Sequence, residues 1–274
     1  MSDIAQTLLA ALGFTVFAWW FSTGVILHLV GLRRTTFSWT MLGASVMLLF
    51  ALTGLYASRD HTSVASAYCG FTCALLVWAW QEVAFLLGFV TGPRRSACER
   101  GVRGGRRAWH AFQTVQHHEL GLLLLGIAVF AATAGGANQT GWWTFVILWT
   151  MRQSAKLNIF LGVRNLNESF LPAHLKYLGS YFRQHWMNPL FPLSVTAATL
   201  FAVPLWQAAL SPAATPFEAT AAALNAGLLS LAILEHWFLV LPLPFDKLWQ
   251  WGLRSREPVT VTAEPAANVE LPSR

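Results

Sequence analysis

The stretch FTCALLVWAWQEVAFLLGFVTGPRR, residues 71–95, decides the fold of this chain. Its first twenty residues contain one charged side chain, Glu82, and the basic residues Arg94 and Arg95 close it. A helix of about 20 mainly apolar residues crosses a bilayer, and basic residues are retained on its cytoplasmic side. The stretch therefore predicts a transmembrane helix that ends in the cytoplasm and carries a carboxylate inside the membrane.

The composition of the whole chain agrees with this local pattern. Of the 274 residues, 55% are hydrophobic and only 11% are charged, whereas about 25% of the residues of a soluble globular protein are charged. Too little polar surface remains to cover a water-soluble protein of this size. The composition excludes a cytosolic enzyme, a nucleic-acid-binding domain and a disordered chain, and it predicts an integral membrane protein with no nucleic-acid partner.

Seven stretches have the length and apolar character of a membrane span. They predict an all-α, polytopic membrane protein, a bundle of about seven transmembrane helices at residues 8–32, 38–57, 63–91, 109–134, 140–161, 187–209 and 217–240.

The basic residues between these stretches predict the orientation. Six arginines lie between the third and fourth predicted spans, whereas the connectors around 135–138 and 211–216 contain no Lys or Arg. With the basic connectors in the cytoplasm, the N-terminus lies outside and the C-terminus lies in the cytoplasm.

Two further segments complete the predicted organisation. Residues 171–186 repeat apolar side chains at Leu171, Leu175, Leu178 and Phe182, which predicts a short interfacial helix with its apolar face on the bilayer. Residues 257–274 are rich in Pro, Ala and Glu and predict a disordered cytoplasmic tail. We therefore expect a single membrane-embedded helical domain over residues 1–256, followed by the tail.

Ionisable residues recur inside the predicted spans, where each charge costs about 2.5–3.5 kcal/mol on insertion scales. At a rise of about 1.5 Å per residue, the opposite directions of the spans bring the ionisable residues of four helices into the same cytoplasmic half of the bilayer. We therefore predict a buried polar cluster formed by Glu82, His117, His118, Glu119, Arg152, Lys156, Glu235 and His236.

Two interpretations of this polar cluster stay open. It is either an ion-pair network that fixes the packing of the helices, or a site for a ligand, a pigment or a partner. A metal site is disfavoured, because a di-iron or di-manganese centre in a helix bundle uses Glu-x-x-His pairs, while here His118 and Glu119, like Glu235 and His236, are adjacent. We assign no metal ligand, and no P-loop, GxGxxG or HExxH motif assigns a catalytic residue.

His28 is a separate candidate for pigment binding. Gly24 lies one turn earlier, where a small residue would let a flat macrocycle approach the helix, so His28 could ligate the magnesium of a chlorophyll-type pigment. The other interpretation is that this histidine simply reaches the membrane interface.

Four stretches of the chain resemble the PuhE family of photosynthetic complex assembly proteins from purple-type and related phototrophic bacteria. They are WWFSTGVIL (19–27), FTCALLVWAWQEVAFLLGFVTGPRR (71–95), MRQSAKLNIFLGVRNLNESFLPAHL (151–175) and EHWFLVLPLP (235–244). The resemblance implies a protein of the bacterial inner membrane, cytoplasmic or intracytoplasmic, that acts in assembly of the photosynthetic reaction centre with its light-harvesting complex. It also implies a link to bacteriochlorophyll production, and it transfers no catalytic residue.

The leading functional hypothesis is therefore a non-enzymatic assembly factor. Its expected partners are reaction-centre and light-harvesting subunits or other assembly factors, within the lipid bilayer. No cofactor follows from the residues themselves.

Two alternatives stay open beside the assembly factor. One is a chaperone that binds bacteriochlorophyll or a precursor through His28, His117, His118 or His236. The other is a membrane enzyme of pigment metabolism that uses Glu82, Glu119 and Glu235 of the buried Glu/His cluster.

Overall fold

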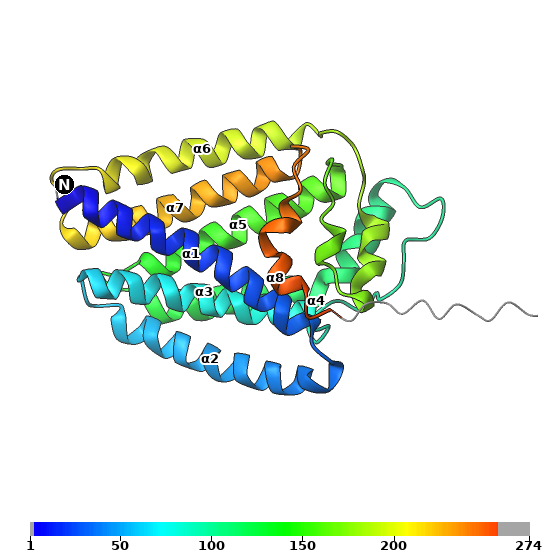
Figure 1. The fold of residues 1–274 in the computed structure, drawn as a ribbon, viewed down its shortest axis with the longest axis horizontal. Helices are drawn as coiled ribbons and strands as arrows, with labels where there is room; N and C mark the ends of the chain where they lie inside the picture. Colours follow the sequence, from blue (N-terminus) through cyan, green and yellow to red (C-terminus); the bar gives the residue numbers. More distant parts are fainter. Residues whose placement is uncertain (1–2, 257–274) are drawn as a thin grey trace, which may run out of the picture.

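The computed structural model describes residues 3–256 and shows an elongated bundle of seven long helices (Figure 1). The long helices are α1 (Asp3–Gly31), α2 (Phe37–Ser58), α3 (Val64–Leu86), α4 (Gly104–Thr133), α5 (Thr140–Leu161), α6 (Leu190–Ala209) and α7 (Pro216–Phe238). Each long helix corresponds to one stretch predicted from the sequence, so the all-helical, polytopic fold is confirmed. The tail predicted at residues 257–274 lies outside the described residues.

Short helices occupy the connectors and the C-terminal part of the described chain. They are the 3-10 helices η1 (Arg34–Thr36), η2 (Glu168–Phe170), η3 (Ala173–Tyr181) and η4 (Phe245–Trp249), and the short α-helix α8 (Gln250–Leu253). η2, η3 and the long loop between α3 and α4 gather at one end of the bundle (Figure 1). This end is called the loop end below.

Six of the long helices are long and apolar enough to cross a membrane. The remaining long helix, α5, has the required length, but its second half carries Arg152, Gln153, Lys156 and Asn158. α5 packs against α3, α4, α6 and α7, and three of these polar residues face a cavity inside the bundle. The protein is therefore a multi-pass membrane protein with one polar helix among its apolar ones.

The helices differ in how much of their surface the bundle covers. α2 packs mainly on α3 at one edge, and α6 packs mainly on α7 at the opposite edge (Figure 1). Most of the apolar stretch of α7 is buried, while α2 and α6 are largely exposed. α3 and α7 thus form the interior, and the exposed apolar faces of α2 and α6 are suited to lipid or to other membrane helices.

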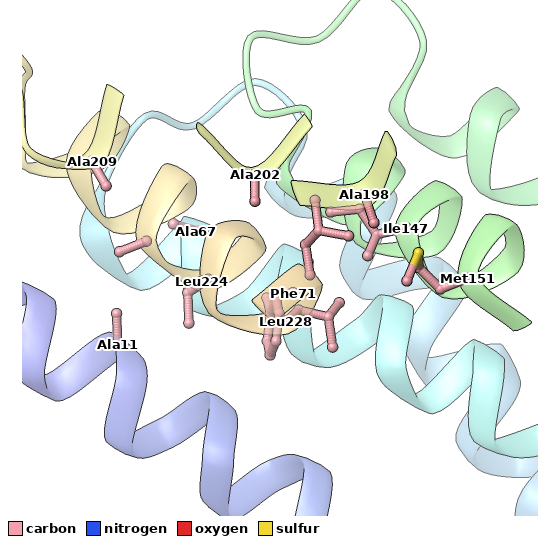
Figure 2. Packing of buried hydrophobic residues seen from close by; sticks show 12 residues of the cluster. Ala11, Ala67, Phe71, Ile147, Met151, Ala198, Ala202, Ala209, Leu224 and Leu228 are labelled. Atoms are coloured by element: carbon pink, nitrogen blue, oxygen red, sulfur yellow. The ribbon is translucent and has the colours of Figure 1, made fainter. Parts of the chain in front are cut away.

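The largest apolar cluster joins α1, α3, α5, α6 and α7 (Figure 2). Small side chains let membrane helices approach closely, so that van der Waals packing replaces the hydrophobic driving force that is missing in lipid. Six of the twelve buried members of this cluster are alanines, namely Ala11, Ala67, Ala198, Ala202, Ala209 and Ala223.

Side chains near two helix starts define where α3 and α7 begin. Ser63 and Ser66 form a reciprocal capping box at the start of α3, and Thr215 and Glu218 do the same for α7. Each box satisfies backbone N–H groups that have no partner within the helix. Both helices therefore start where the sequence provides these polar side chains.

The structure corrects the bounds of several predicted spans. α1 and α4 each begin five residues earlier than predicted, at Asp3 and Gly104. α3 ends at Leu86, and not at 91, because the chain turns at Gly88, whose φ is +86°; the backbone N–H groups of Phe89 and Val90 both donate to the carbonyl of Ala84. α6 starts at Leu190, after Asn188, whose side-chain oxygen accepts a hydrogen bond from the Leu190 N–H group at 2.9 Å.

The interfacial helix predicted at 171–186 exists as the nine-residue helix η3, but its predicted contact with the bilayer is wrong. Leu175 and Leu178 are buried and pack against Phe85 of α3, with Val115 of α4 beside them. The ends of α3 and α4 leave an apolar surface at the loop end, and the apolar face of η3 covers that surface.

The C-terminal strap, residues 239–256, folds back along α1 and includes η4 and α8 (Figure 1). The Trp20 side chain donates to the carbonyl of Leu248, and the Trp249 side chain donates to the carbonyl of Trp20, both at 2.9 Å. A Cβ atom on Gly24 would lie 2.0 Å from Cζ2 of Trp251. Glycine at this position therefore lets the strap pack directly on α1.

Replacing Gly24 by alanine should weaken this packing. We expect Gly24→Ala to lower the free energy of unfolding by about 1–3 kcal/mol, the usual cost of overpacking, measured by thermal unfolding in detergent micelles. Gly43→Ala is the matched control, because nothing lies within 4 Å of a Cβ atom there. Equal unfolding midpoints for the two variants would contradict the packing role of Gly24.

Candidate functional site

A cavity of about 680 Å³ lies among α1, α3, α4, α5 and α7, and residues of η2 and η3 close it at the loop end. Much of its wall is apolar and includes Phe71, Leu75, Trp78 and Met151. Small-molecule sites typically have volumes of about 300–1,000 Å³. This space, called the central cavity below, is therefore large enough for a small molecule.

Most of the predicted polar cluster lies around the central cavity. The structure brings seven of the eight predicted residues to its wall: Glu82 of α3, His118 and Glu119 of α4, Arg152 and Lys156 of α5, and Glu235 and His236 of α7. The eighth, His117, is exposed and does not line the cavity. Adjacent residues on a helix point about 100° apart, so His117 and His118 face different surroundings.

Two ion pairs connect α5 to its neighbours. Nη2 of Arg152 donates to Oε2 of Glu82 on α3 at 3.2 Å. Nζ of Lys156 donates to Oε1 of Glu119 on α4 at 2.5 Å, and the other oxygen of Glu119 accepts from Gln153 at 2.5 Å. The two basic residues lie one helical turn apart, and each reaches a different helix.

Glu235 has a different environment from the other two carboxylates. Its Oε1 accepts a hydrogen bond from the Trp19 side chain at 2.8 Å, and within residues 3–256 it forms no ion pair with a Lys or Arg side chain. Glu235 lines the central cavity and is itself exposed. Glu235 is therefore a carboxylate without a basic partner of its own.

The two cavity histidines are already hydrogen bonded. The amide nitrogen of Gln81 can only donate, so Nδ1 of His118, 2.9 Å away, accepts, and the proton of the neutral ring lies on Nε2. Nδ1 of His236 donates to the carbonyl of Ala232, and Nε2 contacts the Ser154 hydroxyl at 2.8 Å. Neither ring offers a free lone pair to a magnesium ion without rearrangement.

His28, the other pigment-ligand candidate, lies outside the central cavity. Its side chain is exposed on α1, and its carbonyl accepts a hydrogen bond from Ser255 of the C-terminal strap. The space beside Gly24, through which a flat macrocycle would have to approach the helix, holds the indole ring of Trp251. A pigment bound to His28 would therefore have to approach from the outer surface of the bundle.

Basic side chains hold the loop end over the central cavity. Nε of Arg94 donates to the Tyr181 hydroxyl at 2.8 Å, and Nη2 of Arg107 donates to the Tyr181 carbonyl at 2.5 Å. Arg94 also donates to Glu99, and this hydrogen bond lowers the pKa of the Glu99 carboxyl. Burial lowers the pKa of His174, whose ring contacts the carbonyl of Leu86 at the end of α3. These contacts fix η3 as a cover of the cavity.

Three polar contacts of the site were missed by sequence reasoning. Gln153 and Ser154 stand between the two basic residues of α5, so their polarity inside an apolar stretch was a usable signal. Trp19 gave no such signal, because tryptophan is common near membrane interfaces. Within residues 3–256, no group of three or more His, Cys, Asp and Glu side chains is arranged to hold a metal ion.

The fold and the central cavity define a class of protein: a multi-pass helical membrane protein with two acid–base pairs and a further carboxylate around a cavity between its helices. Residues 3–260 match the family described as protein of unknown function, DUF3623, and the chain belongs to that family. No solved structure shows a significant match to the chain.

One relative adds genomic context to this family. The chain is 41% identical over 258 residues to the "Uncharacterized 30.4 kDa protein in puhA 5'region" of Rhodobacter capsulatus, and the match covers 92% of the chain and 93% of that relative. The resemblance to the PuhE family is thereby confirmed.

Breaking one ion pair should destabilise the bundle more than removing both partners. We expect Lys156→Met to lower the free energy of unfolding by about 1–3 kcal/mol, because it leaves the partly buried Glu119 without its base. The double variant with Glu119→Gln should recover most of that loss in the same unfolding measurement. Lys176→Met, at an exposed position of η3, is the control and should unfold like the unmodified protein. Equal losses for the single and double variants would contradict a pairing role.

Proposed function

We propose that the protein is an integral membrane assembly factor for the photosynthetic reaction centre and its light-harvesting complex, and that it modulates bacteriochlorophyll supply. The observation that carries the proposal is the 41% identity, over most of the chain, to the protein from the puhA 5' region. Because puhA is a reaction-centre gene, that position suggests a photosynthesis-related role. The step from this role to assembly rests on the resemblance to the PuhE family.

The exposed helices support an assembly role by providing surface for membrane partners. α2 exposes Trp39 and Phe50, and α6 exposes Leu200 and Phe201, each by 67% or more. Such faces can pack against transmembrane helices of newly made reaction-centre or light-harvesting subunits, or of other assembly factors. The central cavity is not needed for this contact.

The proposal places the protein in the bacterial inner membrane, cytoplasmic or intracytoplasmic, with the loop end in the cytoplasm. Exposed arginines at the loop end support this orientation, because basic residues are retained on the cytoplasmic side. They are Arg95, Arg100, Arg103 and Arg106.

A second candidate function is a chaperone for bacteriochlorophyll or a precursor. The central cavity favours it, because a carrier needs an internal apolar space of this kind. The hydrogen bonds of His118 and His236 argue against ligation of the pigment magnesium inside that space.

Deletion of the gene in a phototrophic host tests the assembly role. We expect the membranes of the deletion strain to contain less reaction centre and antenna, measured by absorption spectroscopy and by immunoblotting of the subunits. The physical reason is that subunits without a membrane partner are assembled more slowly and degraded. Expression of the gene from a plasmid should restore both complexes.

Transcript levels of the neighbouring reaction-centre genes provide the control for effects of the deletion on adjacent genes. With those levels unchanged, unaltered amounts of both complexes under phototrophic conditions would refute the assembly role. A loss of total pigment that precedes the loss of complexes would favour the chaperone instead.

A further inference from the structure

The central cavity combines a polar region with an apolar one, which is the arrangement of a site for an amphipathic molecule. Glu82, Arg152 and Glu235 contribute the polar region from α3, α5 and α7. Phe71 and Trp78 of α3 belong to the apolar wall. A ligand in this space would meet hydrogen-bonding groups at one part and flat apolar surface at another.

The charges around the cavity do not balance within the described chain. Three carboxylates, Glu82, Glu119 and Glu235, face two bases, Arg152 and Lys156. Lys156 is paired with Glu119, and Arg152 is paired with Glu82 at 3.2 Å, so Glu235 has no ion-pair partner within residues 3–256. Glu235 is exposed and lines the cavity, so the polar region favours a group that is positive or donates hydrogen bonds.

A hydrogen-bond acceptor is also left over in the polar region. Glu82 is nine-tenths buried and lines the cavity, and its Oε1 has no hydrogen-bond partner within residues 3–256. A carboxylate oxygen paired with an arginine accepts hydrogen bonds and does not donate them, so this atom also favours a ligand group that donates hydrogen bonds.

We infer that the central cavity binds one amphipathic small molecule whose head group, an ammonium or a hydroxyl, donates hydrogen bonds to Glu235, and whose apolar body lies against α3 and α5. A carboxylate head is disfavoured, because the polar region contributes two carboxylates and one guanidinium, which is already paired with Glu82. The inference goes beyond the assembly role and holds whichever partners contact α2 and α6.

Three naphthalene probes test the inference on the unmodified protein in nanodiscs of zwitterionic lipid. They are 2-(1-naphthyl)ethylamine, 2-(1-naphthyl)ethanol and 1-naphthylacetate, which share one flat body and carry an ammonium, a hydroxyl and a carboxylate. Equilibrium dialysis measures their uptake, with empty nanodiscs as the blank. We expect saturable binding of the amine and the alcohol at one molecule per protein, and at least tenfold weaker binding of the carboxylate.

Two pairs of variants locate the binding in the central cavity. Ala79→Phe fills the cavity from α3 and should abolish saturable binding, whereas Ala208→Phe adds the same ring at an exposed position of α6 and should change nothing. Glu235→Gln should weaken binding of the amine at least tenfold and affect the alcohol less. Asp60→Asn removes an exposed carboxylate outside the cavity and should leave binding of both probes unchanged.

Two outcomes overturn the inference. Uptake no greater than that of empty nanodiscs would mean that water alone fills the cavity, and tighter binding of the carboxylate would mean that Arg152 selects an anionic head. The comparison of the three probes uses only the unmodified protein. It therefore tests the inference even if Glu235→Gln and Ala79→Phe fail to fold. Neither overturning outcome predicts any change in the phenotype of the deletion strain. Failure of the inference is therefore distinguishable from failure of the assembly role.

Discussion

A charge inside a membrane bundle needs a partner from the same bundle, and this constraint organises the interior of the protein. Arg152 and Lys156 are carried by α5, which is long enough to cross a membrane but is more polar than the other long helices. Their partners Glu82 and Glu119 come from α3 and α4, so two ion pairs tie three helices together. Hydrogen bonds with good geometry are required for such pairs to offset the cost of desolvation. The alanine-rich cluster packs the rest of the bundle around this arrangement.

The helices at the two edges of the bundle, α2 and α6, differ from the central helices in how much apolar surface they expose. α3 and α7 are enclosed by other helices, whereas α2 and α6 present large apolar side chains outward. The same chain thus contains an internal site, suited to a small molecule, and external faces, suited to other membrane helices. These two features can act independently, since the residues that line the cavity do not come from α2 or α6.

Much of the fold could be predicted from the sequence, because apolar stretches of about 20 residues are a strong signal for membrane helices. The height of Glu82, Glu119, Arg152 and Glu235 along their helices could also be predicted from the rise per residue. The rotation of each helix could not, and His117 illustrates this, since it lies beside His118 in the chain but faces outward. The position of η3 depended on an apolar surface created by α3 and α4 together, which no local pattern contains. The same is true of Trp251, which packs on a glycine more than two hundred residues earlier.

The C-terminal strap has a consequence for biosynthesis. Trp19 belongs to α1, which leaves the ribosome before the other helices of the described chain, and its ring centroid lies 5.1 Å from that of Trp249, which is among the last parts of the described chain to be made. Trp19 also forms part of the wall of the central cavity. That wall can take its final form only when translation has passed the strap, so the helices of a nascent chain can enter the membrane before the wall of the cavity is complete.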